Sequence, residues 1–261
     1  MWGAGMNKIL APFSLGRPVL ITYVPAGDPK FSKEILDSYL DGGSDILEIG
    51  LPSNDPYMDG EIMGSSMKRS HAAGTDGDVI SRVISQWLTT TKRRPALLWM
   101  CYSDADLTNL EIWANAGTID GILMLGTYPD GLEDRLSNLG LVLTVFVPWD
   151  YTPSDEILAK KATGYIMVPT RPGRTGTGSA VGDPSERVRK MRKLNPNVPV
   201  VAGFGVSDAH SALQIMDSGV DGVVVGTACI DALFKDGSAG LRSTLQKISQ
   251  AIQSLTSKTH I

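Results

Sequence analysis

Two carboxylates stand where their surroundings would set their pKa values apart. Glu48 lies within the apolar run of residues 46–49, and Asp59 follows in a loop punctuated by prolines and a glycine at residues 51–60. An apolar strand disfavours a charged carboxyl group, so we expect a raised pKa for Glu48, whereas Asp59 in a wetter loop should stay ionised. Such a pair suits general acid–base catalysis. A structural ion pair or a hydrogen-bonded strand end is the alternative for Glu48.

Three glycine-rich loops late in the chain have the features of an anion site. They span residues 170–178, 203–207 and 226–228, and each follows a short apolar run. Glycine lets backbone N–H groups approach an anion, and a helix N-terminus adds partial positive charge. Together the loops predict a phosphate-bearing small molecule, with the anion between Gly205 and Thr227. Singly, each loop is equally compatible with a tight turn.

The first of these loops is long and rich in glycine, proline and threonine, which predicts a mobile lid over residues 172–180. Arg171 and Arg174 at its start are either phosphate ligands or solvated surface side chains.

Other kinds of catalytic centre are not indicated. The histidines fall on expected helices or at the tail (His71, His210 and His260), and Cys101 and Cys229 have no metal-ligand spacing. We therefore expect neither a metal nor a cofactor. Trp99 and Tyr23, on expected strands, are either core residues or the lining of a pocket for a ring.

The elements that must position these residues form a repeating pattern of strand and helix. Segments of helical periodicity alternate with short apolar runs at residues 19–24, 46–49, 96–100, 121–125, 141–147, 165–168, 198–202 and 222–225. Such runs are typical of strands buried on both faces. They predict an α/β protein with one (β/α)8 TIM-barrel domain over residues 1–261, of which residues 1–15 are an N-terminal extension. A doubly wound open sheet is the alternative, but residues 25–29 lack the glycine fingerprint of its first turn.

Length and composition agree with one enzyme-sized domain. The 261 residues are 42% hydrophobic and carry a net charge of −4, which disfavours binding to nucleic acid or to anionic membranes. We see no apolar segment long enough to span a membrane and no secretory leader. The two cysteines fit a reduced, cytoplasmic protein.

Several motifs together resemble one known family. Residues 47–56 (LEIGLPSNDP), followed by Asp59 and Gly60, resemble the signature of the tryptophan synthase alpha subunit, as do residues 27–29, 175–176, 203–207 and 226–228. The resemblance covers nearly the whole chain, in order. It implies a (β/α)8 lyase of tryptophan biosynthesis that cleaves indole-3-glycerol phosphate to indole and glyceraldehyde 3-phosphate without a cofactor.

The resemblance also implies residue roles. Glu48 would protonate the indole ring and deprotonate the glycerol hydroxyl, and Asp59 would accept from the indole N–H group. Thr175 would orient Asp59 when the lid closes. The implied substrate-binding residues are Tyr23, Thr175, Gly176, Phe204, Gly205, Gly226 and Thr227.

The chain departs from the family pattern around the pocket and on its rim. Met167 replaces a tyrosine, and Cys101 stands at another tyrosine position with Tyr102 beside it. Residues 61–64 (EIMG) replace Pro-Thr-Ile-Gln, and residues 125–129 differ on the rim that, with residues 52–56, would face a pyridoxal-phosphate beta subunit. A stand-alone lyase, a member of a specialised pathway, a non-catalytic barrel that activates a beta-like subunit, and another phosphate-binding barrel enzyme all stay open.

Overall fold

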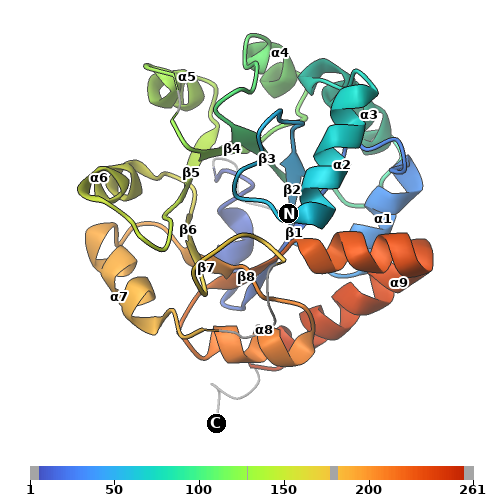
Figure 1. The fold of residues 1–261 in the computed structure, drawn as a ribbon. Helices are drawn as coiled ribbons and strands as arrows, with labels where there is room; N and C mark the ends of the chain where they lie inside the picture. The colour runs from blue at the N-terminus through green and yellow to red at the C-terminus, as the bar shows by residue number, and fades with distance from the viewer. Residues whose placement is uncertain (1–5, 128, 177–181, 256–261) are drawn as a thin grey trace.

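Eight parallel strands close into a barrel in which β8 pairs with β1. The computed structural model describes residues 6–127, 129–176 and 182–255. Its helices form a ring outside the barrel (Figure 1). The strands are β1 Val19–Val24, β2 Ile46–Gly50, β3 Ala96–Tyr102, β4 Gly121–Leu125, β5 Val142–Phe146, β6 Ile166–Pro169, β7 Val200–Gly203 and β8 Gly222–Val225. The predicted (β/α)8 fold is confirmed.

The helices follow the predicted order, with differences at their ends. They are α1 Lys33–Asp41, α2 Glu61–Ala72, α3 Gly77–Leu88, α4 Leu110–Asn115, α5 Leu132–Asn138, α6 Pro153–Lys161, α7 Ser185–Leu194, α8 Ala209–Met216 and α9 Thr227–Gln253. The two helices expected at the C-terminus are both present within the span of α9, separated at Gly237, whose φ of +66° is not helical. Among the described residues, no helix is long and apolar enough to cross a membrane.

Side chains alternate strictly between the inside of the barrel and the layer beneath the helices, as the strand period of two requires. On β3, Met100 and Tyr102 pack in the inner cluster, whereas Trp99 and Cys101 pack in the outer one. Trp99 donates its indole N–H group to the Thr118 carbonyl at 2.9 Å. It is therefore a core residue, and the alternative that it lines a pocket is wrong.

The N-terminal segment closes the floor of the barrel. Ile9 is fully buried in the inner cluster, and a short 3-10 helix follows at Ala11–Leu15. The ring of Phe13 packs on that of Tyr165, with 6.1 Å between centroids. Residues 7–15 of the expected N-terminal extension thus pack against the inner cluster of the barrel.

The N-terminal face of the barrel is held by a repeated hydrogen bond. Shortly before each even-numbered strand, a side-chain oxygen accepts from a backbone N–H group of the preceding odd strand: Asp45 from Leu20 (3.0 Å), Asp120 from Leu97 (2.9 Å), Thr163 from Leu143 (2.9 Å) and Asp221 from Val200 (2.8 Å). The three aspartates also pair with Arg17, Arg94 and Arg192. Stabilising contacts on this face leave the opposite face free for chemistry.

Candidate active site

A cavity of about 430 Å³ opens at the C-terminal ends of the strands. Residues from the strand ends and from the loops after them line it, as in other barrels of this class. All of the site residues predicted from sequence border this one cavity: Tyr23, Glu48, Asp59, Thr175, Gly176, Phe204, Gly205, Gly226 and Thr227.

Glu48 projects into the barrel from β2 and is only 3% exposed. Burial, and secondarily the negative charge of Asp59, raise the pKa of Glu48 to about 8. The Tyr165 hydroxyl lies beside the carboxyl group and opposes this rise. Among the described residues, Glu48 Oε2 has no hydrogen-bond partner. At neutral pH this side chain is therefore mostly the protonated acid.

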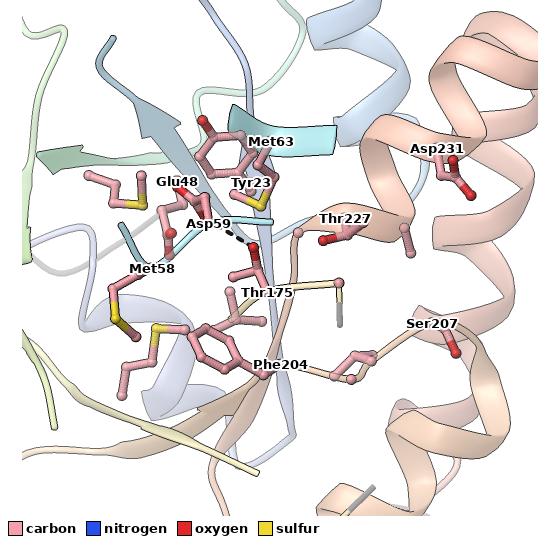
Figure 2. Close-up of a pocket in the computed structure, with 18 of the residues that line it drawn as sticks. Tyr23, Glu48, Met58, Asp59, Met63, Thr175, Phe204, Ser207, Thr227 and Asp231 are labelled. Atoms are coloured by element: carbon pink, nitrogen blue, oxygen red, sulfur yellow. Dashed lines mark hydrogen bonds between the residues drawn. The ribbon is translucent and has the colours of Figure 1, made fainter. Parts of the chain in front are cut away.

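Asp59 is held by two hydroxyl donors. Tyr102 donates to Oδ2 at 2.8 Å, and Thr175 donates to Oδ1 at 3.1 Å (Figure 2). Burial raises the pKa of Asp59 to about 6, although both hydrogen bonds oppose the rise. The expectation of a wet loop is wrong, because Asp59 is only 7% exposed. Its two donors nevertheless favour the carboxylate, which prevails at neutral pH.

The described start of the predicted lid, residues 172–176, is docked onto the loop that carries Asp59. Thr175 N–H donates to the Met58 carbonyl at 3.0 Å, and Gly60 N–H donates to Thr175 Oγ1 at 3.0 Å. A β-carbon on Gly60 would overlap the Thr175 carbonyl oxygen, so this approach requires glycine. Residues 177–180 of the predicted lid lie outside the described residues.

The glycine loops meet on the other side of the cavity from Glu48, near Thr227 (Figure 2). Gly176 and Gly205 have φ of +68° and +83°, which glycine adopts without strain. A β-carbon on Gly176 would lie 3.0 Å from the Thr227 side chain, so the loops after β6 and β8 are closely packed. Thr227 opens α9, whose free N–H groups and dipole favour an anion.

Arg171 adds a cation to this end. Its side chain lines the cavity, whereas Arg174 does not. Arg171 Nε and Nη2 are buried, without a hydrogen-bond partner among the described residues, and Nε lies 3.9 Å from where a β-carbon on Gly205 would sit. A guanidinium with unpaired N–H groups fits an anionic ligand.

The walls around the two carboxyl groups are apolar and suit a flat ring, whereas Ser207, Asp231, Lys235, Asp236 and Thr244 also border the cavity. The apolar walls consist of Tyr23, Met58, Met63, Met100, Leu123, Leu125, Phe146, Met167 and Phe204. The sequence had singled out Tyr23 and Phe204 as binding residues and Met167 as a departure, and two altered stretches included Met63 and Leu125. Met100, Leu123, Leu125 and Phe146 lie on strands, where period-two alternation turns them inward, a signal that was present in the sequence. Met58 comes from the loop after β2 and Met63 from α2.

A family model described as tryptophan synthase alpha chain matches residues 13–260. The chain belongs to this family. The alpha chain of Novosphingobium aromaticivorans is 28% identical over 244 residues, which cover 89% of this chain and 91% of the relative. That of Nitrosococcus oceani is 29% identical over 239 residues, covering 86% and 88%.

Solved structures agree in fold. Tryptophan synthase subunit alpha from Legionella pneumophila str. Paris superposes with a TM-score of 0.81 at 21% identity, covering 96% of this chain and 100% of that one. A chain of Mycobacterium tuberculosis tryptophan synthase gives 0.79 at 22% identity, covering 95% and 99%. At these identities the likeness shows the shared barrel.

The activity of the tryptophan synthase alpha chain family is that of an indole-3-glycerol-phosphate lyase, and at family level the chain is such a carbon–carbon lyase of tryptophan biosynthesis. The departure at the end of β3 involves two neighbouring residues. Tyr102 packs in the inner cluster and bonds Asp59. Cys101 is buried in the outer layer. The hydroxyl that reaches the Asp59 carboxylate from this strand is therefore that of Tyr102.

Of the other stretches that depart from the family pattern, only some residues border the cavity. Of residues 61–64, Met63 borders the cavity. Of residues 125–129, Leu125 borders it, and position 128 lies outside the described residues. His71 on α2 and His210 on α8 do not line the cavity, and His260 lies outside the described residues. Within the described ranges, no group of three or more His, Cys, Asp or Glu side chains is placed to hold a metal ion.

Proposed function

We propose that this chain cleaves indole-3-glycerol phosphate with Glu48 as the acid and base and Asp59 as the group that stabilises the charged ring. One observation carries the proposal. Two buried carboxyl groups with pKa values of about 8 and about 6 face one cavity. At neutral pH one can give a proton while the other holds a negative charge, the division of labour that a pair with separated pKa values allows.

The first step is protonation of the indole ring. The neutral Glu48 carboxyl group gives its proton to C3, which makes that carbon tetrahedral and leaves a positive charge centred on N1. Asp59 accepts the N1–H hydrogen bond and stabilises this charge. Because the cavity excludes most water, the ionic contact is stronger than it would be in solution.

The second step is cleavage of the bond between C3 and the glycerol side chain. The Glu48 carboxylate formed in the first step takes the proton of the hydroxyl on the adjacent side-chain carbon. That oxygen becomes the aldehyde of glyceraldehyde 3-phosphate, and the electrons of the broken bond restore the aromatic indole. Glu48 ends protonated, as it began, so no further co-reactant is needed.

The phosphate fixes the substrate relative to the two acids. Gly176, Gly205, Gly226 and Thr227 bring backbone N–H groups and a helix N-terminus to one end of the cavity, and Arg171 supplies unpaired donors beside Gly205. Tyr23 and Phe204 pack against the ring. Binding energy from the phosphate then orients the reacting bond.

A purely phosphate-binding barrel is the second candidate, and it leaves the acid pair without a purpose. Burying two carboxyl groups at 3% and 7% exposure costs stability that a phosphate binder has no reason to accept. A non-catalytic activator of a beta-like subunit meets the same objection.

We also propose a beta subunit as partner, because the family is that of an alpha chain. The rim that would receive it includes the half-buried Pro52 and Pro56 and the exposed Asp55.

The test is product formation by the purified chain. Incubated alone with indole-3-glycerol phosphate, it should release indole and glyceraldehyde 3-phosphate in equal amounts, detected by absorbance and by a coupled dehydrogenase. Tight binding of the substrate without either product, alone or with a beta subunit, would favour the phosphate-binding candidate.

A further inference from the structure

We propose that the ring-binding half of this cavity accepts indole-3-glycerol phosphates that carry substituents on the benzo ring, because its walls are methionines that can retreat. The proposal rests on the proposed function and names the substrate class of the same site.

Four methionines border this half of the cavity: Met58, Met63, Met100 and Met167. Three of them, Met63, Met100 and Met167, are no more than 6% exposed and belong to the inner cluster of the barrel. Figure 2 shows Glu48 and Asp59 between Met58 and Met63. An unbranched thioether has three rotatable bonds and fills irregular space, so such a wall adapts to shape at low cost.

A neighbouring glycine keeps the tip of Met167 back from the cavity. On β7, Gly203 leaves a recess in the inner wall, and the Met167 methyl group lies in it, because a β-carbon on Gly203 would overlap that methyl group. The tip of Met167 thus occupies space that a side chain at residue 203 would otherwise fill. Met63 is in ordinary contact with a second glycine, its sulfur 3.5 Å from where a β-carbon on Gly226 would lie.

The polar groups are fixed by contrast. Two hydroxyl donors hold Asp59, and the lid contact through Thr175 joins the same carboxylate to Gly60. The edge of the indole that carries N1 is therefore constrained, whereas the benzo edge has no polar atom and must face the apolar wall. A substituent there displaces methionine tips without moving the reacting atoms.

The expectation differs from that of a rigid pocket. A single methyl group is discriminated by roughly 10–200-fold in a fixed hydrophobic pocket. Here we expect kcat/KM for at least two of the 4-, 5-, 6- and 7-methyl substrates to stay within about fivefold of the unsubstituted one.

Two variants separate this wall from the rest of the site. Met167→Leu keeps side-chain volume but replaces the flexible thioether with a branched carbon. Gly203→Ala fills the recess and drives the Met167 methyl into the cavity. Each should lower kcat/KM for the methyl substrates about tenfold more than for the unsubstituted one. Gly64→Ala is the matched glycine control, since its β-carbon would meet nothing closer than Pro56 at 3.8 Å.

Alongside kcat/KM, the Kd is measured for 3-(indol-3-yl)propyl phosphate and its methyl derivatives. These compounds lack the hydroxyl needed for cleavage. In Met167→Leu, a fall in kcat/KM for the methyl substrates together with a matching rise in Kd for the methylated propyl phosphates would support the proposal. A wild type in which fewer than two of the four methyl substrates stay within about fivefold of the unsubstituted one would overturn it. If no substrate is cleaved, the proposed function fails. The Kd values for the propyl phosphates still show whether the methionine side chains accommodate a ring substituent.

Discussion

At the scale of residues, the site depends on two carboxyl groups that lie in different surroundings. Glu48 lies in the middle of the buried strand β2, and one of its oxygens has no hydrogen-bond partner among the described residues, whereas Asp59 is also buried but receives two hydroxyl hydrogen bonds. The sequence predicted the raised pKa of Glu48, because a short apolar run indicates a buried strand. It did not predict the burial of Asp59, which arises when residues far away in the chain, Tyr102 and Thr175, close over it.

The pair predicts a bell-shaped pH profile of kcat/KM. Activity should rise with pH as Asp59 loses its proton at about 6 and fall as Glu48 loses its proton at about 8, since the reaction needs the carboxylate of one and the acid of the other. Initial rates from about pH 5 to about pH 9.5 in a constant-ionic-strength buffer measure both limbs. A flat profile across this range would contradict the assignment.

Tyr102→Phe should move the acid limb. The lost hydroxyl bonds the ionised Asp59, and such a bond contributes about 1.5–3 kcal/mol, so the limb should rise by at least about one pH unit. The alkaline limb should stay where it is. Tyr57→Phe is the control, because Tyr57 packs edge-on against Tyr102 at 5.3 Å without a bond to Asp59. An equal shift in both variants would assign the effect to packing.

At the scale of elements, the active face is built by loops that touch one another. The loop after β2 ends at Gly60, where α2 begins, and the lid after β6 rests on that point through Thr175. Strand positions were predictable from apolar runs alone. The start of α2 was predicted at Gly64, three residues after its start at Glu61, although Glu61 is an acidic residue in the first turn. The break within α9 follows from a single positive φ at Gly237.

Gly60→Ala should impair lid docking. Its β-carbon would overlap the Thr175 carbonyl, so the lid must withdraw and lose about three hydrogen bonds, each contributing about 0.5–1.5 kcal/mol. We expect kcat/KM to fall about 30-fold or more, and the free energy of unfolding to fall by no more than these hydrogen bonds contribute. Gly64→Ala serves again as the glycine control. Wild-type kinetics in Gly60→Ala would show that this contact does not matter for turnover.

At the scale of the whole molecule, the two faces of the barrel divide stability from chemistry. The N-terminal face carries the repeated aspartate and threonine contacts and the segment that fills the floor, and the C-terminal face carries the cavity. Eight alternating units made the barrel predictable. The closed floor was not, because Ile9 and Phe13 give no periodic signal, and their burial follows from the open end of the barrel that they fill.

The altered rim predicts that a generic beta subunit will raise the rate of indole formation only weakly. Tyr57 is 40% exposed there and lies beside Gly126, which joins the loop after β2 to the altered stretch after β4. Mixing with the beta subunit of a bacterial relative should raise the rate of indole formation by less than the ~5-fold at the lower end of typical coupling. Titration of the beta subunit under steady-state conditions, with complex formation followed by sedimentation, would detect a larger gain.

If Glu48 moves the proton in both steps, indole formation should depend on its carboxyl group, and the Glu48→Gln variant tests this. Glutamine keeps the size of the side chain and removes its titration, so turnover of indole-3-glycerol phosphate should fall by at least about four orders of magnitude, the upper range for a general acid–base group. Binding of 3-(indol-3-yl)propyl phosphate should stay within about threefold of wild type, because Glu48 lies away from the phosphate loops. Wild-type turnover by Glu48→Gln would contradict the account.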